Sequence, residues 1–218
     1  MAKNSKIIVT ENGPYLVSGN ISLSEEKIAD DEKGDPLKWK KGKEYQCNEP
    51  YALCRCGDSN NKPFCDRSHA KGFDGRETAS TAKYLGQCGK IEGPGLILTD
   101  AESFCSGAKF CHRKEGAWTL TENSDDPESK KLAIEETHNC PSGRLAVWDK
   151  KEKIIEPELK ESISLTKHSD GTMGPLWIKG KIPVESFSGK KYEARSRMTL
   201  CRCGKSKNKP FCDGKHVF

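Results

Sequence analysis

A twelve-residue cysteine segment occurs twice in this chain of 218 residues, as CRCGDSNNKPFC at residues 54–65 and as CRCGKSKNKPFC at residues 201–212. A histidine follows the last cysteine of each copy, so both copies have the pattern C-x-C-x8-C-x3-H. The two sets of candidate ligands are Cys54, Cys56, Cys65 and His69, and Cys201, Cys203, Cys212 and His216. Three thiolates and one imidazole suit either tetrahedral zinc or an iron–sulfur cluster. The close C-x-C pair favours a two-iron cluster over the wider knuckles that are typical of structural zinc.

The composition favours small modules stabilised by metal over one broad hydrophobic core. Hydrophobic residues make up 33% of the chain and charged residues 32%, and small modules with little apolar surface usually need such support. The eleven cysteines are an odd number with tight local spacing, which indicates metal or cluster ligands in a reducing cytosol. Because no signal peptide and no membrane span is recognisable, we expect a cytoplasmic protein without a membrane partner.

Charge and motifs give little support to other functions. The net charge of +5 comes from interleaved lysines and glutamates, and this pattern gives little support to nucleic-acid binding. No phosphate loop, zincin helix or nucleophile–base pair accompanies the cysteines, so we expect a protein that is not an enzyme.

The repeat is longer than its cysteines. GPYLVSGNISLSE at residues 13–25 matches GPLWIKGKIPVES at residues 174–186, and each copy predicts a β-hairpin or a pair of short strands. The first copy has a polar insertion at residues 29–50, which we expect to be a surface loop that leaves the core unchanged. The charged residues 150–174 are expected to form a solvated connector.

Both cysteine segments resemble the CDGSH-type iron–sulfur family, whose pattern is C-x-C, then Ser or Thr, then Pro-x-Cys-Asp-Gly-x-His. The second copy departs from the family only where Lys215 replaces a small residue. The first copy has Arg67 in place of the glycine, which costs strain if the backbone there has a positive φ. The resemblance implies one 2Fe-2S cluster in each quartet, held by three cysteines and one histidine. It also implies an α+β fold in which two small β-rich units, residues 1–80 and 169–218, form an intrachain pseudo-two-fold pair within a monomer.

Between these units, residues 81–168 contain a different segment followed by the connector. SFCSGAKFC places Cys105 and Cys111 around Ala108, and Cys140 precedes a proline. Over residues 88–148 this segment resembles divergent single-cluster ferredoxins, with a strand at GAWTL and a helix from Asp126 to Asn139. Three thiolates match relatives that hold 3Fe-4S, and a 4Fe-4S cluster needs a further ligand, for which Cys88 and His112 are the nearest candidates. The alternative is a ferredoxin fold that has lost its cluster and serves as a spacer.

The function implied by the resemblance is electron transfer, or cluster storage and transfer, with redox or cluster-acceptor proteins as partners. The alternative is a zinc-stapled interaction module without redox activity. The 16-residue window of the second quartet has five basic residues and one acidic residue, against three and two in the first, so we expect the C-terminal cluster to be reduced first. Four further expectations concern neighbouring residues: Asp66 and Asp213 cap the first turn of a helix that bears the histidine, Ser59 and Ser206 donate to sulfur, Cys47 and Cys88 are structural, and so are His138 and His168.

The histidine ligands predict that both clusters are lost faster in mild acid. Proton binding to an imidazole, whose ordinary pKa is about 6.5, competes with metal binding, whereas a thiolate holds its metal to lower pH. The decay of visible absorbance is the measurement, and equal decay rates at mildly acid and alkaline pH contradict the prediction.

Overall fold

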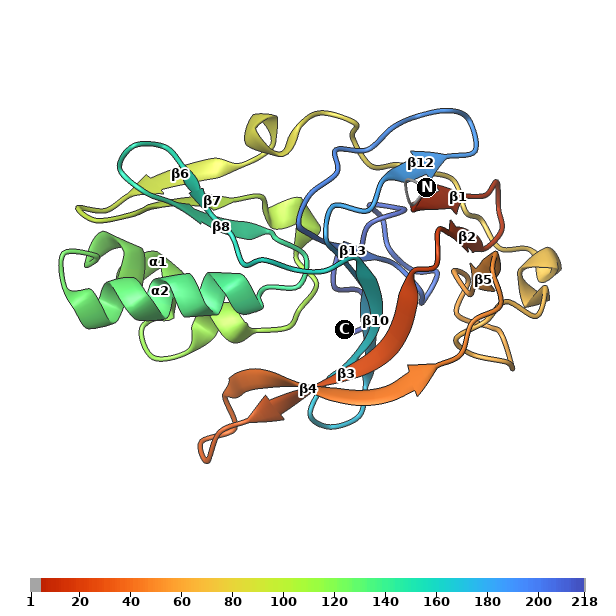
Figure 1. Cartoon of the computed structure of the whole chain (residues 1–218), viewed down its shortest axis with the longest axis horizontal. Coiled ribbons are helices and arrows are strands. Elements are labelled where there is room, and N and C mark those ends of the chain that lie inside the picture. The colour runs from red at the N-terminus through yellow and green to blue at the C-terminus, as the bar shows by residue number, and fades with distance from the viewer. Residues whose placement is uncertain (1–4, 218) are drawn as a thin grey trace.

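The computed structural model describes residues 5–217, whose strands form three sheets (Figure 1). Residues 5–80 and 162–217 contribute the strands of the two repeats: β1 (Lys6–Val9), β2 (Tyr15–Ser18), β3 (Ser22–Asp30), β4 (Pro36–Tyr45), β5 (Tyr51–Leu53), β10 (Ser162–Lys167), β11 (Met173–Lys179), β12 (Val184–Ser186) and β13 (Arg197–Leu200). The middle region contributes β6 (Gly89–Glu92), β7 (Ile97–Asp100), α1 (Gly116–Glu122), α2 (Pro127–Asn139), β8 (Leu145–Trp148) and β9 (Ile154–Ile155). The expected α+β fold is therefore confirmed.

The two repeats exchange one strand each. One sheet has the order β12-β1-β2-β5 and the other β13-β11-β10-β3-β4, so β12 of the second repeat completes the sheet of the first, and β3 does the reverse. Both exchanged strands pair in parallel, β12 with β1 and β3 with β10. The two sheets are related by the expected pseudo-two-fold axis. Because β2 and β3 lie in different sheets, each repeat forms a pair of strands and not a hairpin.

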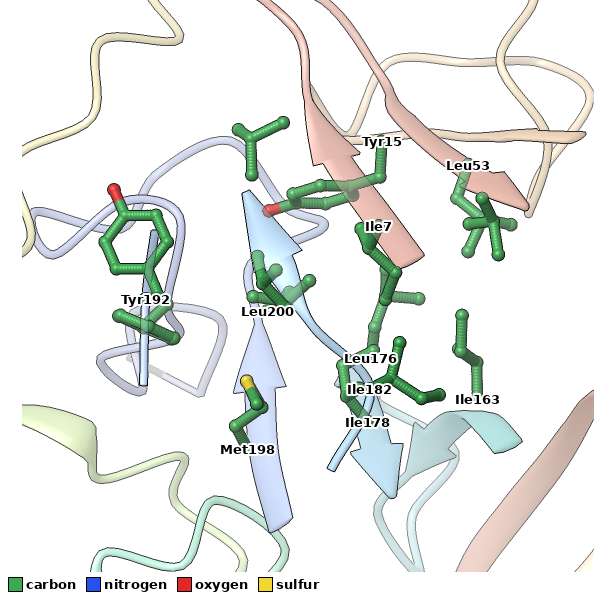
Figure 2. Close-up of a cluster of buried hydrophobic side chains, with 14 of the residues drawn as sticks. Ile7, Tyr15, Leu53, Ile163, Leu176, Ile178, Ile182, Tyr192, Met198 and Leu200 are labelled. Atoms are coloured by element: carbon green, nitrogen blue, oxygen red, sulfur yellow. The ribbon is translucent and has the colours of Figure 1, made fainter. Parts of the chain in front are cut away.

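Apolar residues of both repeats fill one core between these sheets. Strands β1 and β2 bury alternate residues, the pattern of a sheet with one covered face. Figure 2 shows Ile7, Tyr15 and Leu53 of the first repeat in the same cluster as Leu176 and Leu200 of the second. The Tyr15 hydroxyl donates to the carbonyl oxygen of Cys201 at 2.7 Å. Neither repeat has a complete core of its own.

The polarity of the insertion at residues 29–50 predicted a surface loop, and this prediction is wrong. These residues form the greater part of a β-hairpin made by β3 and β4. Its turn is formed by Asp31, whose Oδ1 accepts hydrogen bonds from the backbone N–H groups of Lys33 and Asp35. Charged residues along β4 are compatible with an edge strand, where they discourage pairing with other chains. The insertion also affects the core, because Trp39 packs against Phe110 and Trp177 with ring centroids 5.1 and 5.2 Å away.

Part of the expected connector is a buried strand. In β10, residues 163–166 are all buried, and Ile163 and Leu165 belong to the main core. β10 is the counterpart of β1: Thr166 Oγ1 donates to the Pro175 carbonyl oxygen as Thr10 Oγ1 does to that of Pro14. The repeat therefore begins one strand earlier than the sequence comparison indicated.

The middle region packs two helices on the sheet β6-β7-β8-β9, at the left of Figure 1. The predicted helix at residues 126–139 is confirmed as α2, with the Asp126 carboxylate accepting from the Ser129 N–H at 2.7 Å. The predicted strand at GAWTL is wrong, because these residues form α1. Ala117, Leu120 and Thr121 are buried, and this spacing of three and four residues places them on one helix face.

No helix in the described part of the chain is long and apolar enough to cross a membrane.

Glu136 on α2 is a buried carboxyl group without a partner. Its side chain is fully inaccessible to solvent, and neither carboxyl oxygen has a hydrogen-bond partner among residues 5–217. Burial raises the pKa of Glu136 to about 8, with the positive charge of Arg113 lowering it in part. The folded protein therefore keeps Glu136 protonated at neutral pH, at which an exposed carboxyl is ionised.

We predict that Glu136 makes the protein less stable as the pH rises from about 4.3 through about 8. In that window the folded state binds more protons than the unfolded state, so the free energy of unfolding falls as pH rises. Glu136→Gln removes this slope, and its stability relative to the parent should improve by about 2 kcal/mol between pH 6.5 and pH 8.

Urea unfolding at the two pH values measures the difference. Glu128→Gln is the matched control, because Glu128 lies on the same helix with an exposed side chain. Parallel pH profiles for the parent and Glu136→Gln exclude the assigned protonation.

Candidate metal centres

Each terminal quartet consists of two close pairs of donor atoms. The Sγ atoms of Cys54 and Cys56 are 3.7 Å apart, and Cys65 Sγ lies 3.3 Å from His69 Nδ1. The second quartet repeats this geometry, at 3.6 Å for Cys201 and Cys203 and 3.4 Å for Cys212 Sγ and His216 Nδ1. The sequence-predicted residues are thus brought together in pairs.

The pairs fit two metal ions per quartet better than one. Two sulfur ligands at about 2.3 Å from one tetrahedral metal lie about 3.8 Å apart, close to the spacing of each cysteine pair. Among residues 5–217, however, no group of three or more His, Cys, Asp and Glu side chains is arranged to hold a single metal ion. A two-iron cluster meets both observations, since each iron takes two protein ligands and bridging sulfide completes its shell.

A strand end and a returning loop bring the third cysteine to the first two. The Cys54 N–H donates to the Pro63 carbonyl oxygen, and the Cys65 N–H donates to that of Ala52. The corresponding bonds in the second unit run from Cys201 to Pro210 and from Cys212 to Thr199. The loop therefore pairs in an antiparallel manner with the strand that precedes it, and this pairing determines the spacing of the ligands.

Backbone N–H groups, and not the predicted serine hydroxyls, donate to the ligand sulfurs. The N–H groups of Asp58, Arg67 and Gly214 each lie 3.4 Å from the Sγ of the cysteine two residues earlier. Such donors stabilise negative charge on sulfur. The predicted role of Ser59 and Ser206 is wrong: their hydroxyls donate to the carbonyl oxygens of Phe64 and Phe211 and so hold the loop.

Asp66 and Asp213 brace the same loop at both ends. Asp66 accepts from the N–H groups of Ser68 and Asn60, and hydrogen bonds from Ser68 hold the pKa of this carboxyl well below its usual range. Asp213 has equivalent bonds. The next residue has a positive φ in both copies, 71° at Arg67 and 83° at Gly214, so the strain expected for Arg67 is present.

A buried arginine stands between the first two cysteines of each quartet. Arg55 donates to the carbonyl oxygens of Thr10 and Gly75, and Arg202 donates to those of Gly174 and Thr166. Burial lowers the pKa of Arg202 to about 10, which leaves it charged at neutral pH. Arg202 therefore keeps a positive charge within electrostatic range of Cys54 and Cys203.

The two terminal quartets adjoin at the pseudo-two-fold axis. A Cβ added to Gly57 would meet the Cys203 carbonyl oxygen at 2.8 Å, and one added to Gly204 would meet that of Cys56 still more closely. Both glycines also have a positive φ. Only glycine allows this approach, which brings the C-x-C loops of the two units into backbone contact.

The three cysteines of the middle region also lie near one another. Burial raises the pKa of Cys111 to about 12, and the neighbouring thiols of Cys140 and Cys105 add to the rise. Arg144, held by Asp100 at 2.6 Å, has its pKa raised first by that carboxylate and also by Cys105. A guanidinium near these thiols would stabilise the negative charge of a cluster held there.

Two arginines that the sequence reasoning missed hold the Cys140 loop. Arg197 is buried and donates to the carbonyl oxygens of Thr137 and Cys140 and to the Glu156 carboxylate. Arg195 donates to the carbonyl oxygens of Ser142 and Gly143. Their position in EARSRMTLC, just before the second quartet, is the signal that could have indicated a link between the two sites.

The cysteines and histidines expected to be structural differ in their surroundings. Cys47 and Cys88 pack against the main core, and the His138 Nε2 lies 3.0 Å from the Ile155 carbonyl oxygen. His168 is different, because its Nε2 lies 3.3 Å from that of His216. Burial, with His168 adding to the effect, lowers the pKa of His216 to about 4, so the neutral imidazole that binds metal is favoured and proton competition at this quartet is expected at a lower pH than the ordinary imidazole pKa indicates.

Comparison with known proteins assigns three segments. Residues 12–70 and 173–217 both match the family model described as an iron-binding zinc finger of CDGSH type. Residues 91–150 match the model described as a divergent 4Fe-4S mono-cluster. Neither the curated proteins nor the solved structures gave a significant match. Both resemblances inferred from the cysteine patterns are confirmed.

The two terminal quartets differ in exposure at the third cysteine. Cys212 is buried at 2% exposure, whereas Cys65 is partly exposed. We predict that an iron chelator removes metal from the N-terminal quartet several times faster. Cys212→Ser and Cys65→Ser leave one intact quartet each, and the rate of bleaching compares them directly. Equal rates in the two variants contradict the prediction.

Proposed function

Because this iron–sulfur protein carries two CDGSH-type segments around a divergent single-cluster segment, we propose that it is an electron carrier with three centres. Each terminal quartet holds one 2Fe-2S cluster, and Cys105, Cys111 and Cys140 hold a third cluster of three or four irons. The observation that carries the proposal is the pairing of donors at 3.3–3.7 Å in both quartets. A cluster supplies reversible uptake of one electron; the protein binds it, sets its potential and limits its access to solvent.

The histidine and the buried arginine both favour the reduced state. A neutral imidazole in place of a thiolate makes a cluster less negative, which raises its reduction potential. Arg202 adds a positive charge within electrostatic range of Cys54 and Cys203, and the sulfur-directed N–H groups act in the same direction. These features support electron carriage, so we propose that the protein is a carrier and not an enzyme.

A groove beside the C-terminal quartet supports an acidic protein as the partner. It has a volume of about 770 Å³, and Phe187 at its edge is 68% exposed. Three acidic residues line it, Glu11, Asp74 and Glu77; Asp74 pairs with Arg76, and Glu77 accepts from the Tyr192 hydroxyl. The basic residues that line it are Arg76, Lys190, Lys205, Lys207 and Lys209. A partner with acidic residues around its own redox centre fits this groove.

Iron and sulfide counting on anaerobically purified protein tests the proposal. We expect more than four irons per chain, visible absorbance from iron–sulfur charge transfer and an electron paramagnetic resonance signal after reduction. Cys54→Ser and Cys201→Ser should each remove one two-iron cluster and leave the other. Cys47→Ser is the matched control, because Cys47 lies outside all three sites. Colourless protein that contains only zinc overturns the proposed function and favours a zinc-stapled interaction module.

A further inference from the structure

The cysteine loop of the middle region rests directly on the C-terminal quartet. The Asn208 side chain donates to the Ser103 carbonyl oxygen at 2.8 Å. Phe104 meets Phe211 edge to face, with ring centroids 5.1 Å apart and planes at 89°. Phe104 directly precedes Cys105, and Phe211 directly precedes Cys212, so this aromatic pair links the two sites through adjacent residues.

A second contact joins the same two loops on the far side of the ligands. A Cβ added to Gly107 would lie 2.9 Å from Val217 Cγ2, and Val217 directly follows the ligand His216. Both contacts lie within two residues of the candidate ligands Cys105, Cys212 and His216, so the two sites are close enough for the charge of one to affect the other.

The third cysteine of the middle region is attached to the same unit. Arg197 and Arg195 hold the Cys140 loop through its carbonyl oxygens, and β13, which begins at Arg197, leads directly to Cys201. The loop that contains Cys105 and the loop that contains Cys140 are thus both attached to the C-terminal unit.

Within residues 5–217, the N-terminal quartet has no such neighbour. Phe64, the counterpart of Phe211, packs against Tyr45 and Tyr51 of its own unit, at 6.2 and 6.4 Å. The difference also explains why Cys65 is partly exposed and Cys212 is not. The C-terminal quartet lies between the other two sites, because it also adjoins the N-terminal quartet at Gly57 and Gly204.

We propose that the C-terminal site is the junction of the three, redox-coupled to the middle site through the Phe104–Phe211 and Gly107–Val217 contacts, whereas the N-terminal site is not coupled to the middle site. The inference rests on the proposed function. An electron on one centre raises the energy of adding an electron to its neighbour, and this coupling is reciprocal. The negative charge of the middle site therefore opposes the effect of the lysines around the C-terminal quartet and lowers its potential.

Two variants that each keep a single terminal cluster allow the effect of the middle centre on that cluster to be measured separately. Cys65→Ser leaves the C-terminal and middle sites, and Cys212→Ser leaves the N-terminal and middle sites. Adding Cys111→Ser removes the middle centre from each. A redox titration followed by electron paramagnetic resonance should show the C-terminal cluster becoming easier to reduce by roughly tenfold in the reduction equilibrium, which is 59 mV for one electron. The N-terminal cluster should not move.

A variant that retains all ligands tests the contact itself. Gly107→Ala pushes the loop away from Val217 and should reduce the shift caused by Cys111→Ser. Gly171→Ala is the matched control, because Gly171 also has a positive φ, 92°, but nothing within 4 Å of an added Cβ.

The outcomes separate this inference from the proposed function. Equal shifts in both backgrounds, or no shift in either when iron analysis shows the middle centre lost, overturn the coupling. A parent protein with only four irons also overturns it and leaves two terminal clusters standing. A parent protein whose terminal quartets contain no iron overturns the proposed function itself.

Discussion

The parallel pairing of β1 with β12 and of β10 with β3 is the interaction on which the structure depends. Each repeat alone has too few strands and too little apolar surface for a stable sheet with a covered face. Exchange of one strand completes both sheets and merges their inner faces into a single core. The ligand loops follow β5 and β13, so this core also sets the distance and orientation between the two terminal quartets. Lys179 and Ser164 reinforce the exchange by binding Glu26 of β3.

The insertion of the middle region makes two nearly identical quartets unequal. Their ligands, bracing aspartates and buried arginines correspond position by position, yet only the C-terminal quartet is covered by Phe104 and only His216 has a second histidine beside it. A duplicated site thus acquires two environments without any change in its ligands. Exposure, neighbouring charge and contact with a third centre are the physical quantities that differ.

The repeated cysteine pattern was enough to predict the family, because ligand spacing is a local property of the chain, and the resemblance to that family then predicted the two-fold relation. Local signals also predicted α2 from Asp126 and Pro127. GAWTL was misassigned because five residues show no clear period, and only packing against the middle core reveals the helix. Polarity suggested a loop at residues 29–50, since an edge hairpin and a loop have similar composition. The roles of Arg195, Arg197 and Phe104 depend on contacts between distant segments, which no local pattern contains.

The strand exchange also has a consequence for how the chain is made. During synthesis β1 leaves the ribosome long before its partner β12, and at about 5–20 residues per second the gap lasts many seconds. Throughout that time the nascent first repeat has an open sheet edge and no complete core around Cys54 and Cys56. The surroundings of these two thiols are therefore completed only after β12 has emerged.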